Sequence, residues 1–157
     1  SNFNFITHNP LDFLAENGFE VELVLLNHPG SALGYKIKVK GITICYFTDN
    51  EIDPPYKKMI EFNQLVEKCS GADILIHDAQ YTKDDMPLKH GWGHSLIHQV
   101  TELGYKAKVK NIVYFHHDPE RTDDQLDELL EKESNWLKSK NSVSTPIFAQ
   151  ERITLEF

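Results

Sequence analysis

The feature that most constrains the fold of this chain is a short apolar stretch that ends in two polar side chains. Residues 72–82 read A-D-I-L-I-H-D-A-Q-Y-T, so that three consecutive apolar residues precede His77 and Asp78. A short apolar run bounded by polar residues predicts a buried strand. The α/β folds commonly build sites where strands deliver such side chains at their carboxyl ends, although polar residues also simply mark where a strand ends. The stretch predicts a strand of an α/β fold with a candidate site at its end.

Strand patterns recur along the chain, and helix patterns alternate with the later ones. Further strands are predicted over residues 19–26, 34–40, 42–47, 109–115, 146–149 and 152–157. Helices are predicted over residues 56–69, over 96–103 and from 122 onward, with one helical turn at 11–15. Strands that come first, followed by strands that alternate with helices, predict an α/β layer with a sheet and helices against one face. Several strands are apolar enough to be covered on both faces, so the second face needs another cover.

Residues with strong positional preferences predict where helices begin and end. Ser95 is placed to cap the helix over 96–103, and Gly104 is placed to end it. Thr122 with Gln125 has the spacing of a capping box, in which each side chain bonds the other residue's backbone. The pattern of the 56–69 helix puts Met59, Phe62, Val66 and Cys69 in the core.

Length and composition limit the functions that this chain can have. The 157 residues fit one domain, 1–157, and the net charge of −8 argues against broad nucleic-acid or anionic-membrane binding through a basic face. Cys45 and Cys69 lie in apolar patterns and predict buried free thiols of a reducing compartment. The sequence contains neither an apolar run of transmembrane length nor a signal-peptide pattern, which leads us to expect a soluble, cytoplasmic chain.

Histidine is frequent and clustered in this sequence. Six of the eight histidines fall within one part of the chain, at His77, His90, His94, His98, His116 and His117. Imidazoles mixed with carboxylates at strand ends are a typical donor set for a metal ion.

Three residues at strand ends are candidate metal ligands: His28 after the first strand, Asp49 after the hairpin and His116 after the late strand. Taken singly, each has an ordinary structural explanation as a turn or surface residue. Together, at the ends of strands in one sheet, they favour a site for zinc or manganese, with iron as a third option. A carboxylate can bridge two ions, as two-metal hydrolases require.

A second constellation pairs Asp78 with His94. Between them lies Gly91-Trp92-Gly93, whose glycines allow close backbone approach to a ligand. A carboxylate that holds an imidazole gives an oriented general acid or base. The alternative is that Asp78 caps a turn and His94 merely precedes a helix. The remaining clustered histidines are expected to be structural or solvated (His77, His90 and His98), and the role of His117 is open.

Several of these strings resemble one protein family in the same order. The strings are N-H-P-G-S-A-L-G-Y, Y-F-T-D-N-E, A-D-I-L-I-H-D-A-Q-Y-T, G-W-G-H-S and F-H-H-D-P, from about residue 26 to 119. They resemble the metallo-β-lactamase-fold hydrolases, in the phosphodiesterase branch that includes tRNA 3′-processing endonucleases and cyclic-phosphate phosphodiesterases. The resemblance implies an αββα sandwich with two divalent ions between the sheets.

The resemblance also implies a role for each candidate residue. His28 and His116 match two of the family's histidine ligands, and Asp49 matches its bridging aspartate. The H-D-A-Q that begins at His77 resembles an H-E-A-T motif whose acid pairs with a later histidine. Asp78 and His94 fall on those two positions and are the predicted catalytic residues.

The sequence departs from this family at one large point. The signature H-x-H-x-D-H, which supplies most ligands of one metal, is absent, and His8, followed by Asn9-Pro10, does not replace it. The chain is therefore expected to be the C-terminal half to two-thirds of such a domain. The other part is then missing, degraded or supplied by another chain. An exposed sheet face would follow, and with it self-association or pairing with the missing half.

Three functions remain open on this evidence. The leading hypothesis is a metal-dependent phosphodiesterase in which metal-activated hydroxide attacks the phosphorus of a small cyclic phosphate or of RNA, with weak or no activity in this chain alone. The second is a non-catalytic or degenerate fragment that binds a partner or oligomerises. The third is a hydrolase of the same fold that acts on an ester, lactone or thioester.

Overall fold

The computed structural model describes residues 9–156, and a six-stranded sheet runs through it. The strands are β1 (Phe19–Leu26), β2 (Ala32–Val39), β3 (Ile42–Phe47), β4 (Ile74–Asp78), β5 (Asn111–Phe115) and β6 (Thr145–Phe148). They lie in chain order across the sheet. Pairing is antiparallel between β1 and β2 and between β2 and β3, and parallel from β3 to β6. Only β2 runs in the opposite direction among these strands, so β1, β3, β4 and β5 all end at the same edge of the sheet.

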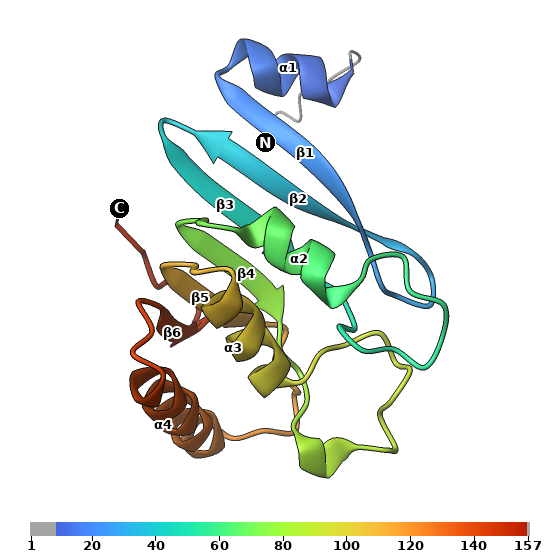
Figure 1. Cartoon of the computed structure of the whole chain (residues 1–157), viewed down its shortest axis with the longest axis vertical. Helices are drawn as coiled ribbons and strands as arrows, with labels where there is room; N and C mark the ends of the chain where they lie inside the picture. The colour runs from blue at the N-terminus through green and yellow to red at the C-terminus, as the bar shows by residue number, and fades with distance from the viewer. Residues whose placement is uncertain (1–8, 157) are drawn as a thin grey trace.

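Helices connect the parallel strands and lie on one face of the sheet. They are α2 (Phe62–Cys69), α3 (Ile97–Lys106) and α4 (Asp123–Ser139), with α1 (Pro10–Glu16) before β1 and the short 3₁₀ helix η1 (Lys83–Asp85) after β4. Crossovers between parallel strands are almost always right-handed. Because these three connections step along the sheet in one direction, they put their helices on the same side. Figure 1 shows α2 and α3 in front of the sheet. The predicted α/β layer with helices on one face is confirmed.

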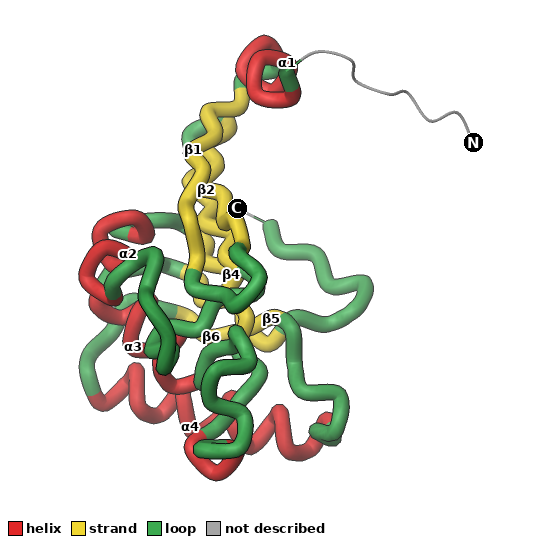
Figure 2. Tube along the Cα trace, turned by 90° about the vertical axis from the view of Figure 1, so that its right-hand side faces the viewer, coloured by secondary structure: helices red, strands yellow, loops and turns green. Residues whose placement is uncertain are grey.

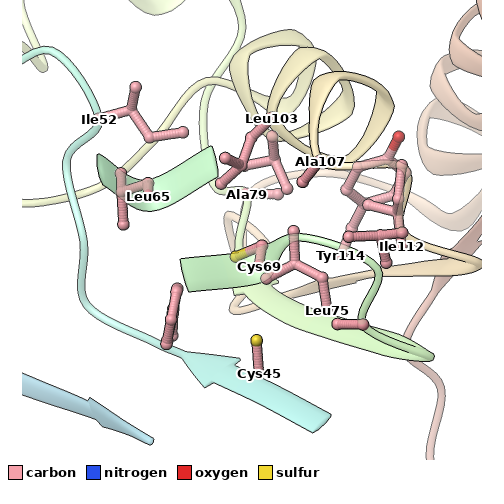
Figure 3. Packing of buried hydrophobic residues seen from close by; sticks show 14 of the residues in the cluster. Cys45, Ile52, Leu65, Cys69, Leu75, Ala79, Leu103, Ala107, Ile112 and Tyr114 are labelled. Carbon is pink, nitrogen blue, oxygen red and sulfur yellow. The ribbon is translucent and has the colours of Figure 1, made fainter. Parts of the chain in front are cut away.

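The core lies between this face of the sheet and α2 and α3. Cys45, Leu75 and Tyr114 of the strands meet Cys69 and Leu103 of the helices there, each at most 2% exposed (Figure 3). Both cysteines are buried and free, as predicted.

The first crossover helix begins later than the sequence predicts. Residues 56–61 are not helical, and Asn27 holds the backbone of residues 59 and 60. Its side-chain oxygen accepts hydrogen bonds from the amides of Met59 (2.7 Å) and Ile60 (3.0 Å), and its amide nitrogen donates to Ile60 O at 2.9 Å. Met59, predicted in the core, is therefore 51% exposed, whereas Leu65 is fully buried.

Both predicted ends of α3 are also wrong. Ser95 does not cap the helix, because its hydroxyl donates to Asn50 O and accepts from the amide of Ile52. Gly104 lies inside the helix, where a Cβ atom would come within 2.3 Å of Ile112 Cδ1, so this glycine permits close packing of helix on strand. The Thr122–Gln125 capping box of α4 is confirmed.

The chain ends differ from expectation as well. The helical turn at 11–15 is confirmed within α1. Residues 152–156 form no strand, and Phe157 and His8 lie outside the described residues. Among residues 9–156, none of the helices has the length and apolar character that a bilayer crossing requires.

The opposite face of the sheet is apolar, and it is uncovered over β1 and β2, whereas Ile74 of β4 and Val113 of β5 are buried. Side chains of Leu23 and Leu25 on β1 pair across the sheet with Tyr35 and Leu33 on β2, and all four are 38–51% exposed. Strand alternation puts them on the face away from Val24 and Leu26, which are buried under the helices. Figure 2 shows this face from the edge, with α2 and α3 on one side and the C-terminal segment on the other. The sequence-based expectation that this face needs another cover agrees with this exposure.

Candidate metal centre

Histidine and aspartate side chains converge at the edge of the sheet where four strands end. His28 lies two residues after β1, Asp49 two residues after β3, and His116 directly after β5, while Asp78 is the last residue of β4. His94 comes from the loop that precedes α3. This edge collects them because the carboxyl ends of strands that run in one direction meet there.

The five side chains lie within reach of one another. Asp49 Oδ1 is 3.4 Å from His116 Nδ1, the ring centroids of His94 and His116 are 4.7 Å apart, and those of His28 and His94 are 6.0 Å apart. Donor atoms lie within 4.8 Å of one another in two sets, His28/Asp49/His94 and Asp78/His94/His116. Imidazole nitrogens with carboxylate oxygens suit a divalent metal ion of the zinc, manganese or iron type. The structure therefore brings together all five residues that the sequence singled out.

Two of these residues have unusual backbone conformations. Asp49 has a φ of 55° and His116 a φ of 57°, in the left-handed region that residues other than glycine rarely occupy. Such conformations cluster at functional sites, where the surrounding structure offsets their cost of about 1–3 kcal/mol. The side chains that these two turns carry lie together, with Asp49 Oδ1 3.4 Å from His116 Nδ1.

Asp78 is fully buried, and backbone donors surround it. Its carboxylate accepts hydrogen bonds from the amides of Asn50 (2.6 Å) and Ser95 (2.8 Å), and it lies 3.3 Å from His94 Nδ1. These contacts fix the carboxylate and, through it, the His94 ring. The hydrogen bond to Asp78 raises the pKa of His94, against the opposing effect of burial, and the charges of Asp78, Asp49 and Glu51 add to the rise.

His77, one residue earlier, points to the other side of the sheet. Its ring packs against Phe47, with Nε2 3.0 Å from the amide nitrogen of Asn50 and Nδ1 2.7 Å from Asp78 O. Burial lowers the pKa of His77. A neutral ring that accepts from Asn50 and donates to the carbonyl satisfies both contacts, which agrees with the predicted structural role.

The other clustered histidines lie outside both donor sets. His98 Nδ1 is 2.8 Å from Glu133, His90 Nε2 is 3.0 Å from Asp53 O, and His117 Nε2 is 3.0 Å from Ala149 O. His117, whose role the sequence left open, thus contacts the segment that follows β6.

A buried polar network that the sequence did not reveal holds the strand ends together. The main-chain N–H of Asn27 donates to Asn50 Oδ1 at 2.9 Å, and the main-chain carbonyl of Asn27 accepts from the main-chain N–H of Glu51 at 2.7 Å. These bonds join the end of β1 to the end of β3, beside His28 and Asp49. Asparagine and glutamate are mostly exposed in proteins, so residue type alone predicts surface positions here. The only sequence signal for this network is that Asn27, Asn50 and Glu51 lie next to the predicted ligands His28 and Asp49 along the chain.

Comparison of the sequence with curated proteins finds ribonucleases Z. The enzyme of Thermoplasma acidophilum is 32% identical over 84 residues, which cover 54% of this chain and 24% of that protein. The enzyme of Halalkalibacterium halodurans is 25% identical over 161 residues, 76% of this chain and 52% of that protein. The chain thus spans about half or less of the length of these relatives. No protein-family model matches the sequence.

Comparison with solved structures finds the metallo-β-lactamase fold. The metallo-β-lactamase fold protein YhfI of Bacillus subtilis superimposes with a TM-score of 0.61 and 16% identity, covering 84% of this chain and 46% of that one. Human tRNase Z, short form, superimposes with a TM-score of 0.59 and 18% identity, covering 88% of this chain and 43% of that one. A diphosphatase of the PhnP family superimposes with a TM-score of 0.59 and 19% identity, covering 89% of this chain and 44% of that one. The αβ layer of this chain is therefore part of a metallo-β-lactamase-type sandwich, as expected.

Proposed function

We propose that this chain, which has the metallo-β-lactamase fold and is related in sequence to ribonuclease Z, forms the C-terminal portion of a metal-dependent phosphodiester hydrolase. In this proposal residues 1–157 belong to one domain. The observation that carries it is the convergence of three imidazoles and two carboxylates at one sheet edge, in two sets with donor atoms within 4.8 Å.

The metal ligands in this proposal are His28, Asp49 and His116. Asp49 Oδ1 lies 3.4 Å from His116 Nδ1, and the Asp49 carboxylate is grouped with His28, so these residues would hold divalent ions of the zinc, manganese or iron type. A divalent ion bound there polarises a phosphoryl oxygen and lowers the pKa of water.

The catalytic pair in this proposal is Asp78 with His94. Asp78 is fully buried and accepts two backbone hydrogen bonds, so it is fixed as a positioning carboxylate. His94 Nδ1 faces Asp78, which leaves Nε2 to face the substrate. When the phosphorus–oxygen bond breaks, the leaving oxygen takes the proton from His94 Nε2. The raised pKa of His94 favours the protonated ring that this step needs.

Metal affinity tests the ligand assignment without requiring turnover. We expect Asp49→Ala and His116→Ala each to weaken zinc binding at least about tenfold in calorimetric titrations, because each removes a direct donor. His98→Ala is the matched control, since His98 lies outside both donor sets, and it is expected to leave zinc affinity unchanged.

Activity provides the second arm of this test. Manganese- or zinc-dependent hydrolysis of bis(p-nitrophenyl) phosphate is expected to be slow, because this chain lacks the H-x-H-x-D-H ligands, and to disappear in both variants. Zinc affinity and turnover that neither Asp49→Ala nor His116→Ala changes would sink the assignment.

Two other functions predict different results. A non-catalytic or degenerate fragment that binds a partner predicts no metal at His28, Asp49 and His116. A hydrolase of an ester, lactone or thioester predicts metal binding with turnover of p-nitrophenyl acetate instead of the phosphodiester. The names of the similar proteins, ribonuclease Z and a diphosphatase of the PhnP family, favour a phosphorus-centred reaction on RNA or a smaller phosphodiester.

The uncovered sheet face is proposed to pack against the remaining portion of the domain. This chain covers only 43–46% of the solved chains it resembles, and its apolar face has Leu25 51% and Leu33 46% exposed. The proposed partners do not include a membrane, and we expect a cytoplasmic location. Without its cover, such a face favours association between copies of the chain.

Solution mass tests this proposal. We expect the isolated chain to self-associate, and a lysine at both Leu25 and Leu33, which are paired across β1 and β2, to shift it to the monomer mass in light scattering after size exclusion. Leu88→Lys is the control, because Leu88 is 84% exposed in the loop after η1 and not on the sheet. A monomeric wild-type chain, or equal effects of the two changes, would contradict the prediction.

A further inference from the structure

Residues 91–93, hereafter the indole loop, are clamped by one buried carboxylate. Glu51, which is 2% exposed, accepts a hydrogen bond from the amide of Gly91 at 2.8 Å and another from the amide of Gly93 at 3.0 Å. Tyr56 also donates to this carboxylate at 3.3 Å. A carboxylate that accepts from two backbone amides fixes the loop more strongly than neutral hydrogen bonds do.

The indole loop lies directly against the candidate metal centre. A Cβ atom at Gly93 would come within 2.3 Å of His28 Cδ2, so the loop backbone touches the imidazole of a proposed ligand. The next residue, His94, belongs to both donor sets. Whatever the loop presents is therefore held at a fixed position beside the strand ends.

The loop presents a large aromatic ring to solvent. Trp92 is 57% exposed, whereas Trp136 is half-buried against His98 and Tyr105. The ammonium group of Lys89 lies 4.9 Å from the centroid of the Trp92 ring and 5.5 Å from that of Tyr81. The Tyr81 ring in turn lies 5.9 Å from the His94 ring. A continuous series of contacts thus leads from the exposed indole, through a cation, to the proposed catalytic histidine.

We propose that Trp92 and Lys89 form a base-binding subsite for the substrate. A nucleobase stacks on the exposed face of the indole, and Lys89 attracts the phosphate that the base carries. An aromatic ring on a rigid support stacks with any base, and a nearby cation holds the backbone charge. This proposal rests on the proposed function and narrows its substrate to phosphodiesters that carry a base, in preference to base-free cyclic phosphates.

Tryptophan fluorescence tests the subsite directly. The chain contains two tryptophans, so Trp136→Phe leaves Trp92 as the sole emitter. We expect AMP to quench its emission saturably and ribose 5-phosphate, which lacks the base, to leave it unchanged. Lys89→Gln in the same background is expected to raise the AMP concentration at half-saturation by roughly fivefold, as loss of a cation near an aromatic ring and a phosphate predicts.

The matched control is Trp92→Phe, in which Trp136 alone emits and AMP is expected to have no effect. The difference between wild type and Trp92→Phe gives the same answer if Trp136→Phe does not fold. Absence of an AMP response from Trp92, or an equal response to ribose 5-phosphate, overturns the subsite. The titration needs neither metal nor turnover, so a failure of the subsite can be told apart from a failure of the hydrolase proposal, which zinc affinity and turnover test.

Discussion

Asp78→Asn is expected to lower the free energy of unfolding by about 2–4 kcal/mol, because each buried donor left without a partner costs about 1–3 kcal/mol. The carboxylate is fully buried and accepts from the amides of Asn50 and Ser95 while it contacts His94. An asparagine side chain has the same shape, but its amide nitrogen donates. The new amide group would therefore place a donor against a main-chain N–H that now donates to the Asp78 carboxylate, and that N–H would lose its acceptor. Domains of this size are stable by only about 5–15 kcal/mol, so the change is large.

Urea denaturation followed by circular dichroism measures this loss. Asp53→Asn is the matched control, since it makes the same chemical change at an exposed residue that pairs with Lys58 at 3.0 Å on the surface. Exposed ion pairs contribute at most about 1 kcal/mol, so the control is expected to stay within that range. Equal, small effects of the two substitutions would show that Asp78 does not anchor the strand ends.

Gly93→Ala is expected to weaken zinc binding at least about tenfold, because a methyl group there displaces a proposed ligand. The added Cβ atom would lie 2.3 Å from Cδ2 and 2.7 Å from Nε2 of His28, and 2.9 Å from Pro29 Cδ. Contacts this short require His28 to move. Gly93 also has a φ of 96°, which alanine adopts at a cost of about 1–2 kcal/mol.

Gly41→Ala separates these two effects. Gly41, in the turn between β2 and β3, has a φ of 81°, and a Cβ atom there would meet nothing within 4 Å. It therefore carries the conformational cost without the steric contact. We expect calorimetry to show unchanged zinc affinity for Gly41→Ala, with a modest loss of stability in both variants. Reduced affinity in both, or in neither, would refute the close contact between Gly93 and His28 as the cause.

Local patterns in the sequence predicted most of the sheet. The strands over residues 19–26 and 42–47 have the predicted bounds, because apolar alternation and a glycine turn act over a few residues. The Thr122–Gln125 capping box likewise depends on residues three apart. Patterns of this range determine where strands and helix N-termini form.

Long-range contacts overrode local preference elsewhere. Asn27 holds residues 59 and 60 out of a helix from a distance of more than thirty positions, and the close packing of Gly104 on Ile112 lets α3 continue through a residue that commonly ends helices. The Ser95 hydroxyl bonds Asn50 O and so does not cap α3. No local pattern of these residues predicts partners so far apart in sequence.

For the candidate site, too, the sequence indicated some features and only the tertiary structure decided others. The sequence alone indicated the five residues His28, Asp49, Asp78, His94 and His116, since their types suit metal and proton chemistry and they follow predicted strands or a glycine loop. Only the tertiary structure decided that they meet, because the common direction of β1, β3, β4 and β5 brings four strand ends to one edge. It also decided what supports them: the network of Asn27 and Asn50 and the clamp by Glu51 depend on burial, which residue type does not predict.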